Sequence, residues 1–142
     1  MRAAIVVLAA CAVPPASAPE PIAVAVLPHV PFSKLDRDQR MQLMKEQVVP
    51  AMRPLFVGHD VTKFASFGCE TCHGNGATTG RFEMPNPQLP ILTLDDMSKF
   101  DRRDIEWMKS EVWPAMVKLV DEPPFDPDQP TGFGCSSCHL RN

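Results

Sequence analysis

The sequence contains no tyrosine, no run of basic residues and no apolar stretch long enough to cross a bilayer. Its 142 residues carry a formal net charge of −3, with a sequence pI near 5.7. Proteins that bind nucleic acid usually present a basic patch, so this balance argues against a nucleic-acid partner. Aromatic side chains are few, with eight Phe and two Trp, and a chain this small therefore has little large apolar surface of its own.

One five-residue pattern, Cys-x-x-Cys-His, occurs twice, as CETCH at residues 69–73 and as CSSCH at residues 135–139. This is the attachment pattern of c-type haem, in which two thiols bind the porphyrin edge and the histidine binds the iron. We expect two covalently bound haem c groups, with Cys69, Cys72, Cys135 and Cys138 as attachment sites and His73 and His139 as proximal ligands.

Other uses of a Cys-x-x-Cys pair were weighed: a disulfide, a thioredoxin-type redox pair and half of a four-cysteine zinc site. Zinc would leave both following histidines unexplained, and the two pairs lie farther apart than a zinc ribbon normally tolerates. A thioredoxin-type pair follows a strand, but no strand-rich run precedes either pair here. The histidines therefore favour haem.

The N-terminus has the features of an export signal. A positive start is followed by an apolar run up to residue 10, and Leu-Ala-Ala-Cys at residues 8–11 resembles a bacterial lipobox. We expect a signal peptide at 1–10 and lipidation of Cys11, which also accounts for the unpaired fifth cysteine. The competing interpretation is cleavage after Ala-Ser-Ala at 16–18. Either way the protein is expected outside the cytoplasm, periplasmic or anchored to the outer membrane of a bacterium.

Residues 11–31 are rich in proline, which favours a semi-extended tether between the lipid anchor and a dihaem domain at 32–142. That domain contains an internal repeat, which divides it into haem unit 1 (32–94) and haem unit 2 (95–142). The matched segments are SKLDR at 33–37 with SKFDR at 98–102, VVPAM at 48–52 with VWPAM at 112–116, and Phe-Gly-Cys at 67–69 with 133–135.

The pattern predicts a mainly α fold with few or no strands, built from duplicated helix–loop–haem-motif units around the two haems. Apolar residues recur at steps of three and four in each unit, which places them on one helix face. Ser33 and Ser98, each three residues before an aspartate, are predicted to open a capping box. Pro50 and Pro114 are expected to kink or break the helix, with the second half restarting at the proline. Residues 84–90 should form a covering loop.

The sixth ligand of each iron is left open by the sequence. Two further histidines exist, but His29 lies in the tether and His59 has no counterpart in the second unit, so symmetrical bis-histidine ligation is not expected. Methionines at equivalent helix positions are better candidates, although methionine at helical spacing usually packs in a core. The candidates are Met52 with Met116, then Met44 with Met108, and Met84 for the first haem alone.

A helix that carries methionine, followed by a turn and the haem motif, resembles the repeat of the tetrahaem cytochrome subunit of photosynthetic reaction centres. The two units here stand in place of four, and the prolines depart from that plan. More broadly, the chain is similar to small dihaem c-type cytochromes through its two haem motifs. That resemblance implies electron transfer to redox protein partners.

An enzymatic alternative is a dihaem peroxidase or sulfur-compound oxidase, and a third possibility is a haem-based gas sensor. Both need an open iron position, and an enzyme also needs acid or base groups beside it. Arg81 and Glu83 lie near the first motif but are interpreted as solvated. We therefore expect an electron carrier rather than an enzyme.

Overall fold

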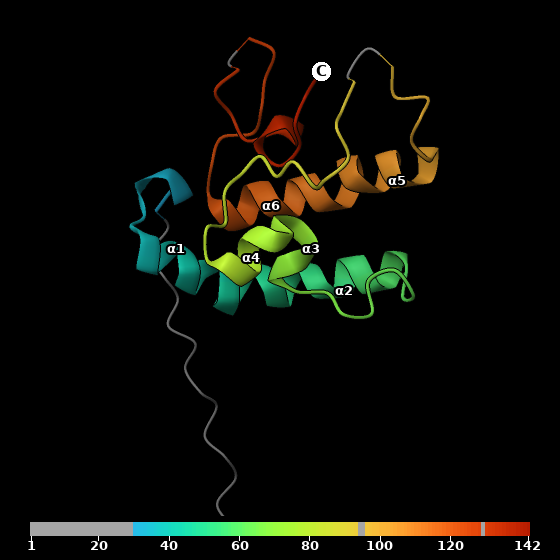
Figure 1. The fold of residues 1–142 in the computed structure, drawn as a ribbon. Helices are drawn as coiled ribbons and strands as arrows, with labels where there is room; N and C mark the ends of the chain where they lie inside the picture. The colour runs from blue at the N-terminus through green and yellow to red at the C-terminus, as the bar shows by residue number, and fades with distance from the viewer. Residues whose placement is uncertain (1–29, 94–95, 129) are drawn as a thin grey trace, which may run out of the picture.

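The computed structural model describes residues 30–93, 96–128 and 130–142 (Figure 1). In these residues the protein is mainly helical, as expected, and the only β pairing is two isolated bridges, Leu92–Arg141 and Pro124–Phe133. None of the described helices is both long and apolar enough to span a membrane. The predicted signal peptide, Cys11, His29 and all but the last two residues of the tether lie outside the described residues.

Two long helical stretches form the framework, and each contains a π-helical turn. Their successive segments are α1 (Arg37–Leu43), the π turn η2 (Met44–Val48) and α2 (Val49–His59), and then α5 (Arg102–Trp107), the π turn η3 (Met108–Val112) and α6 (Trp113–Val120). Shorter helices occupy the connections and the two motifs: η1 (Phe32–Lys34), α3 (Cys69–His73), α4 (Asn75–Thr79) and η4 (Cys135–Ser137).

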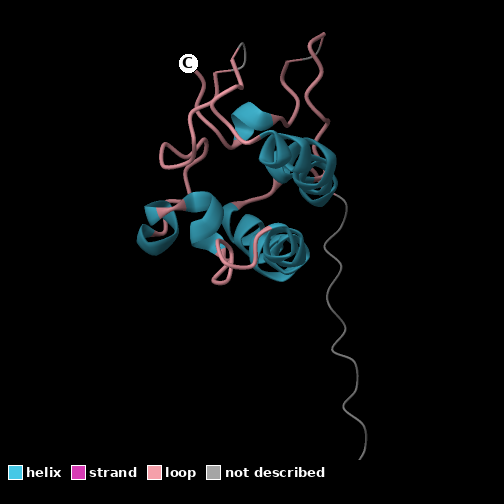
Figure 2. Cartoon of the chain, turned by 90° about the vertical axis from the view of Figure 1, so that its right-hand side faces the viewer, coloured by secondary structure: helices cyan, strands magenta, loops and turns pink. Residues whose placement is uncertain are grey.

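The two stretches pack against each other and run in opposite directions (Figure 1). The π turn η2 contacts α6, and η3 contacts α2, so each stretch meets the other in an equivalent way. The helices α3 and α4 lie to one side of this pair, and η4 lies beyond α6 (Figure 2). The two motifs are thus carried on short helices at the flank of a two-helix core.

The helix starts differ from the predicted capping boxes. The N-caps are Asp36 and Asp101, not Ser33 and Ser98, because each aspartate side chain accepts a backbone N–H from the first turn that follows. At the first cap, Gln39 completes the box by accepting the Asp36 N–H at 2.9 Å. Both serines lie before these helices, Ser33 within the short helix η1 and Ser98 in the segment that leads to α5.

Pro50 and Pro114 do not break the helices, contrary to expectation. Each lies in the first turn of the following helix, as predicted, but the chain is already helical before it. A π turn precedes each proline, and its closing hydrogen bond runs five residues back, from Val49 N–H to the Met44 carbonyl in the first copy. The wider turn provides a helical path in which the missing proline N–H and the bulky ring are tolerated.

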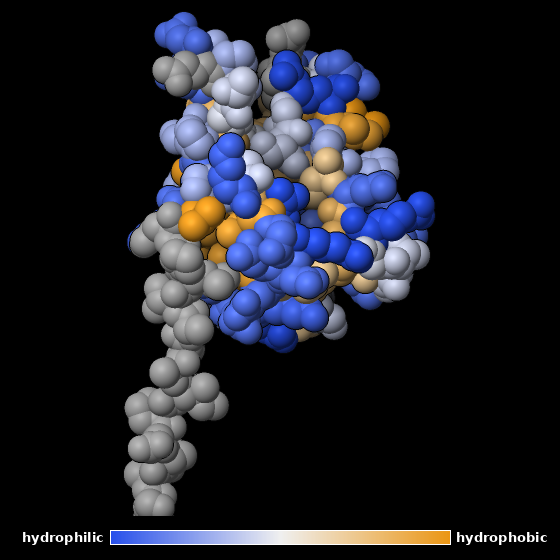
Figure 3. Space-filling view, turned by 90° about the vertical axis from the view of Figure 1, so that its left-hand side faces the viewer, coloured by the Kyte–Doolittle hydropathy of each residue, from blue (hydrophilic) through white to orange (hydrophobic). Residues whose placement is uncertain are grey.

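The core lies between the two helical stretches. Its buried members are Leu35, Leu43, Val48, Met52, Phe56, Phe67 and Val112. Phe56 is central, with the Phe67 ring 4.7 Å away and the Trp107 ring 4.8 Å away between centroids. Aromatic contacts at these distances stabilise a core beyond the area they bury. The outer face shown in Figure 3 is largely hydrophilic, with small apolar areas between polar side chains.

Candidate haem sites

Both haem motifs begin with the same local hydrogen bonds. The Gly68 N–H donates to the Thr71 hydroxyl at 3.1 Å, and the Gly134 N–H donates to the Ser137 hydroxyl at the same distance. In return, the backbone N–H of each hydroxyl residue donates to the glycine carbonyl, at 3.0 Å and 2.9 Å. These bonds fold the two cysteines of each motif onto one tight turn, so the thiols project from a common local frame.

The long helices hold the residue that precedes each Gly-Cys pair. In the second unit, the indole Nε1 of Trp113 donates to the Phe133 carbonyl at 2.9 Å. In the first unit, Arg53 Nη1 donates to the equivalent Phe67 carbonyl at 3.3 Å. Each motif is therefore tied to the helix of its own unit, although the two units use different donors at different helix positions.

The four cysteines of the motifs carry free thiols in the structure. Burial raises the pKa of the Cys72 thiol to about 11, with a further contribution from the neighbouring Cys69. Burial also raises the pKa of Cys138, to about 12, and the proximity of Cys72 and Cys135 adds to it. The second cysteines of the two motifs are therefore close enough to influence each other, and both face low-polarity surroundings.

The two motif histidines are held in different ways. His139 Nδ1 lies 2.9 Å from the Pro90 carbonyl oxygen and so donates to it, which leaves Nε2 as the free ring nitrogen. The His73 ring contacts Phe82 edge-on at 5.3 Å between centroids. Its Nδ1 is buried and has no hydrogen-bond partner among the described residues. Burial lowers the pKa of His73, which favours the neutral imidazole that binds metals.

The segment 84–92, which we call the strap, runs between the two motifs (Figure 1). Asn86 is 3% exposed, and its side-chain Nδ2 donates to the Cys72 carbonyl at 2.8 Å. Its backbone N–H donates to the Cys138 carbonyl at 3.0 Å. One residue thus bonds the second cysteine of both motifs. The sequence predicted this segment to be a covering loop, and it is a loop, but it lies between the motifs.

Further strap contacts reach both sides. On the first motif, Gln88 Oε1 accepts the Asn75 N–H at 2.6 Å, and the close approach leaves room only for glycine at position 74, where φ is +52°. On the second motif, the Leu92 N–H donates to the Leu140 carbonyl at 2.8 Å, and Asn142 donates back to Leu92 at 3.1 Å. The second motif is therefore bonded to residues of the predicted first unit as well as to residues of its own.

An open cleft of about 630 Å³ lies beside Cys69, between α1 and the first motif. This volume is within the usual range of cofactor and ligand pockets. Its walls are formed by α1 with η2, by the first motif and by the turn after α4, and its lining residues are Arg37, Met41, Lys45, Ser66, Gly68, Cys69, Glu70, Ala77, Gly80 and Phe82. The lining carries two cations, Arg37 and Lys45, and one carboxylate, Glu70, together with the apolar side chains of Met41, Ala77 and Phe82.

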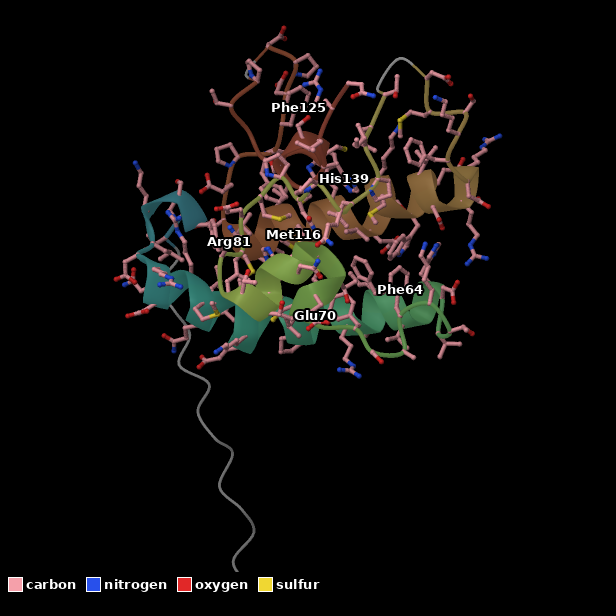
Figure 4. The ribbon with its side chains drawn as sticks, viewed as in Figure 1. Phe64, Glu70, Arg81, Met116, Phe125 and His139 are labelled. Carbon is pink, nitrogen blue, oxygen red and sulfur yellow. The ribbon has the colours of Figure 1, made fainter. Side chains whose placement is uncertain are left out.

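The candidate sixth ligands are distributed over the helices and the strap. Met52 is 3% exposed and belongs to the same buried cluster as Phe67, two residues before Cys69. Met116 on α6, Met44 and Met108 are partly buried against that cluster, and Met84 is partly buried at the start of the strap. Figure 4 shows Met116 on α6, with His139 beyond that helix and Glu70 on the opposite side. The described contacts do not favour one of these methionines over the others as the sixth ligand.

His59, the remaining described histidine outside the motifs, is already engaged. Its Nε2 lies 2.6 Å from Asp104 Oδ1, and its ring stacks on Trp107 at the far end of α2. Arg81 and Glu83 are exposed, as expected for solvated side chains. Among the described residues, no three His, Cys, Asp or Glu side chains converge as a metal-binding group.

Several residues of the site were missed in the sequence. Asn86 and Gln88 lie in a proline-rich loop, and no local pattern connects them with residues so far along the chain. A signal did exist for Thr71 and Ser137, since both motifs place a hydroxyl residue directly before the second cysteine. Comparisons with protein-family models, with curated proteins and with solved structures gave no match for this chain.

The donor groups of both motifs fit haem c. Each motif offers two unpaired thiols on one turn and a histidine with a ring nitrogen free of protein partners. A buried ring nitrogen without a partner, as at His73, calls for a ligand, because unsatisfied buried polar groups are costly. Cys69, Cys72 and His73 would hold one haem, and Cys135, Cys138 and His139 the other.

Proposed function

We propose that the protein is a dihaem c-type cytochrome that transfers electrons between redox protein partners outside the cytoplasm. Each bound haem supplies an iron that cycles between the ferrous and ferric states. The chain itself would attach the two groups and orient their histidines. A lipid anchor at Cys11 would keep the protein at a membrane, with residues 11–31 as its tether.

The observation that carries this proposal is the joining of two like motifs by one residue. Both motifs have the same glycine–hydroxyl turn, and Asn86 bonds the peptide carbonyls of Cys72 and Cys138. A carrier with two centres needs them at a fixed and short separation. The matching arrangement of the two helical stretches, each with a π turn before a proline, supports an origin of the domain by duplication.

Contacts around the two motif histidines restrain their rings, which supports their use as fixed iron ligands. The Pro90 carbonyl fixes the ring orientation and tautomer of His139, as outer partners of metal-bound histidines generally do. Phe82 restrains the His73 ring on the first motif. Neither contact requires a charged group or a substrate, which is consistent with electron transfer rather than bond-making chemistry.

The alternative function is a dihaem redox enzyme of the peroxidase or sulfur-compound oxidase type. The open cleft beside Cys69 favours it, because Arg37, Lys45 and Glu70 place charged groups at an accessible site. General acid–base work requires such groups within hydrogen-bond reach of a substrate. In the carrier, Arg37 and Lys45 would instead be solvated cations at the edge of the first haem site.

The test is an optical comparison of the oxidised and reduced holoprotein, with and without carbon monoxide. A carrier with two six-coordinate irons should show low-spin spectra, a methionine–iron band in the near infrared and no change with carbon monoxide. Binding of carbon monoxide to one haem of the wild-type protein would favour the enzyme or sensor. Absence of any covalent haem would overturn both.

A further inference from the structure

The strap supplies part of the surroundings of the second haem motif, beside the contacts that Trp113 and residues 123–125 make with Phe133. Residues 140–142, which follow this motif, form no helix, whereas α4 follows the first motif and packs on α3. In place of a helix, residues 140–142 pair with Leu92 through two backbone hydrogen bonds. The acceptor for His139 Nδ1 is likewise a strap atom, the Pro90 carbonyl.

Asn86 stands where the strap touches both motifs. It is the buried polar residue of the described chain, and its hydrogen-bonding groups are all used. Nδ2 donates to Cys72, Oδ1 accepts the Gln88 N–H at 2.9 Å, and the backbone N–H donates to Cys138. A buried asparagine bonded through Nδ2, Oδ1 and its backbone N–H favours one arrangement of the groups around it, since a shift of either motif leaves a polar group unpaired.

We propose that Asn86 is a positioning residue that locks the two haem motifs into one rigid unit, and that the strap of the first unit thereby completes the second haem site. The inference rests on the proposed function, because Asn86 sets the relative placement of two redox centres only if both motifs carry haem. Its physical content is a coupling between Cys72 and Cys138 that is carried by one residue, through its side chain to Cys72 and its backbone N–H to Cys138.

The substitution Asn86→Asp in the holoprotein isolates this coupling. It keeps the backbone N–H for Cys138 and the Oδ1 acceptor for Gln88, and it replaces the Cys72 donor by an anionic oxygen. Loss of one hydrogen bond should lower the exchange protection of the Leu92 and Asn142 amide protons, where the strap pairs with the residues that follow the second motif, about tenfold at neutral pH. The matched controls are Asn75→Asp and Asn142→Asp, the same chemical change at exposed positions close to the first and second motifs. Both should retain the wild-type protection of the Leu92 amide, which is the amide compared in the controls because Asn142→Asp changes the intrinsic exchange of its own amide.

A change of pH separates positioning from simple loss of packing. The new carboxyl, when protonated, has an O–H that can donate to the Cys72 carbonyl again. Protection in the Asn86→Asp variant should therefore recover, relative to wild type, as the pH falls through the pKa of this buried carboxyl. The Asn86→Ala variant has no donor in either range, so its protection should stay low. Equal protection in Asn86→Asp and the two controls at neutral pH would overturn the inference.

The wild-type protein provides a second test that does not depend on a variant folding. Three amides report on the two motifs: Gly74 directly follows the first, and Leu92 and Asn142 pair with each other beside the second. If the motifs form one unit, all three amides should exchange through one common opening as denaturant is added. Openings of different free energy for the two motifs would contradict the proposal.

These outcomes are distinguishable from a failure of the proposed function. Intact mass and optical spectra decide whether the protein carries two haems. A two-haem protein with independent motif openings would lose only the role of Asn86. A protein without haem that still shows one common opening would keep that role and lose the electron-transfer function.

Discussion

The rings of His59 and Trp107 lie face to face, with centroids 3.9 Å apart and planes 8° from parallel. The same imidazole donates from Nε2 to Asp104, so both its face and its edge are used to tie the end of α2 to α5. Because His59 has this structural use, the sixth iron ligands of the proposed cytochrome are expected to be methionines.

Met52→Ala and Met116→Ala should each convert one haem to a high-spin form that binds carbon monoxide. Loss of the thioether ligand should also lower the midpoint potential of that haem, since methionine ligation raises it. Optical spectra and redox titrations measure both effects. Unchanged spectra in Met52→Ala would move the first ligand to Met84 or Met44, and an unchanged Met116→Ala would favour Met108.

The haem stoichiometry gives a direct prediction. Protein matured in an oxidising compartment should carry two covalent haems by intact mass. Cys72→Ser should leave the first haem attached through one thioether or lost, and Cys138→Ser should do the same for the second. The unaltered motif in each variant serves as the internal control. A wild-type protein whose intact mass shows one covalent haem or none would contradict the assignment.

The hydroxyl before each second cysteine should contribute about 1 kcal/mol to the stability of its motif, the usual value for a side chain that satisfies a turn N–H. We expect Thr71→Val and Ser137→Ala to lower the free energy of unfolding by this amount in urea titrations. Thr71→Ser, which keeps the hydroxyl, and Ser136→Ala, at the exposed neighbouring position, should have little effect.

Acid should weaken the contact between α2 and α5. The hydrogen bond from His59 holds the pKa of the Asp104 carboxyl below its usual value near 4, with smaller contributions from Lys63 and Arg103. A carboxyl whose pKa is lower in the folded state than in the unfolded state stabilises the fold at pH values above its unfolded-state pKa. This stabilisation is lost as the pH falls through its folded-state pKa. In Asp104→Asn, the free energy of unfolding should therefore fall less steeply than in wild type as the pH is lowered into the acid range. Asp128→Asn, in an exposed turn, should leave this pH dependence unchanged.

Anchoring is predicted from the lipobox. Cells that express the full chain should hold it in the membrane fraction, and Cys11→Ser should release the protein or block its processing. N-terminal sequencing of the mature protein gives the check. A soluble protein that begins at Pro19 would instead identify cleavage after the Ala-Ser-Ala segment.

The sequence predicted the helical class because apolar residues at steps of three and four define a helix without reference to distant contacts. It also indicated the haem motifs, whose chemistry is contained in five consecutive residues. The helix caps were assigned to the wrong residues, since Ser33 and Asp36 are both good caps and only the packed structure decides between them. The continuity of the helix through Pro50 was missed because a π turn has no clear sequence signal.

The strap was predicted as a loop without its role. Prolines at 85, 87 and 90 exclude helix and inner strand, which is a local property of the chain. The bonds of Asn86 join residues 14 positions away and 52 positions away, and such pairings depend on how the two helical stretches pack. Burial of an asparagine in a polar segment is likewise a tertiary property.

The two π turns have a consequence for how the chain can change length. Each places one more residue in the helix than an α-helical path would need, so a deletion of one residue within Met44–Val48 could be absorbed without opening the helix. The deletion would convert the π turn into an α turn, so Met41 and Met52 would keep nearly the same relative direction around the helix axis. It would also bring the Pro50 ring against the preceding turn. A length change of one residue here would thus leave the cleft wall and the helix content almost the same, and its main cost would fall on the packing of Pro50.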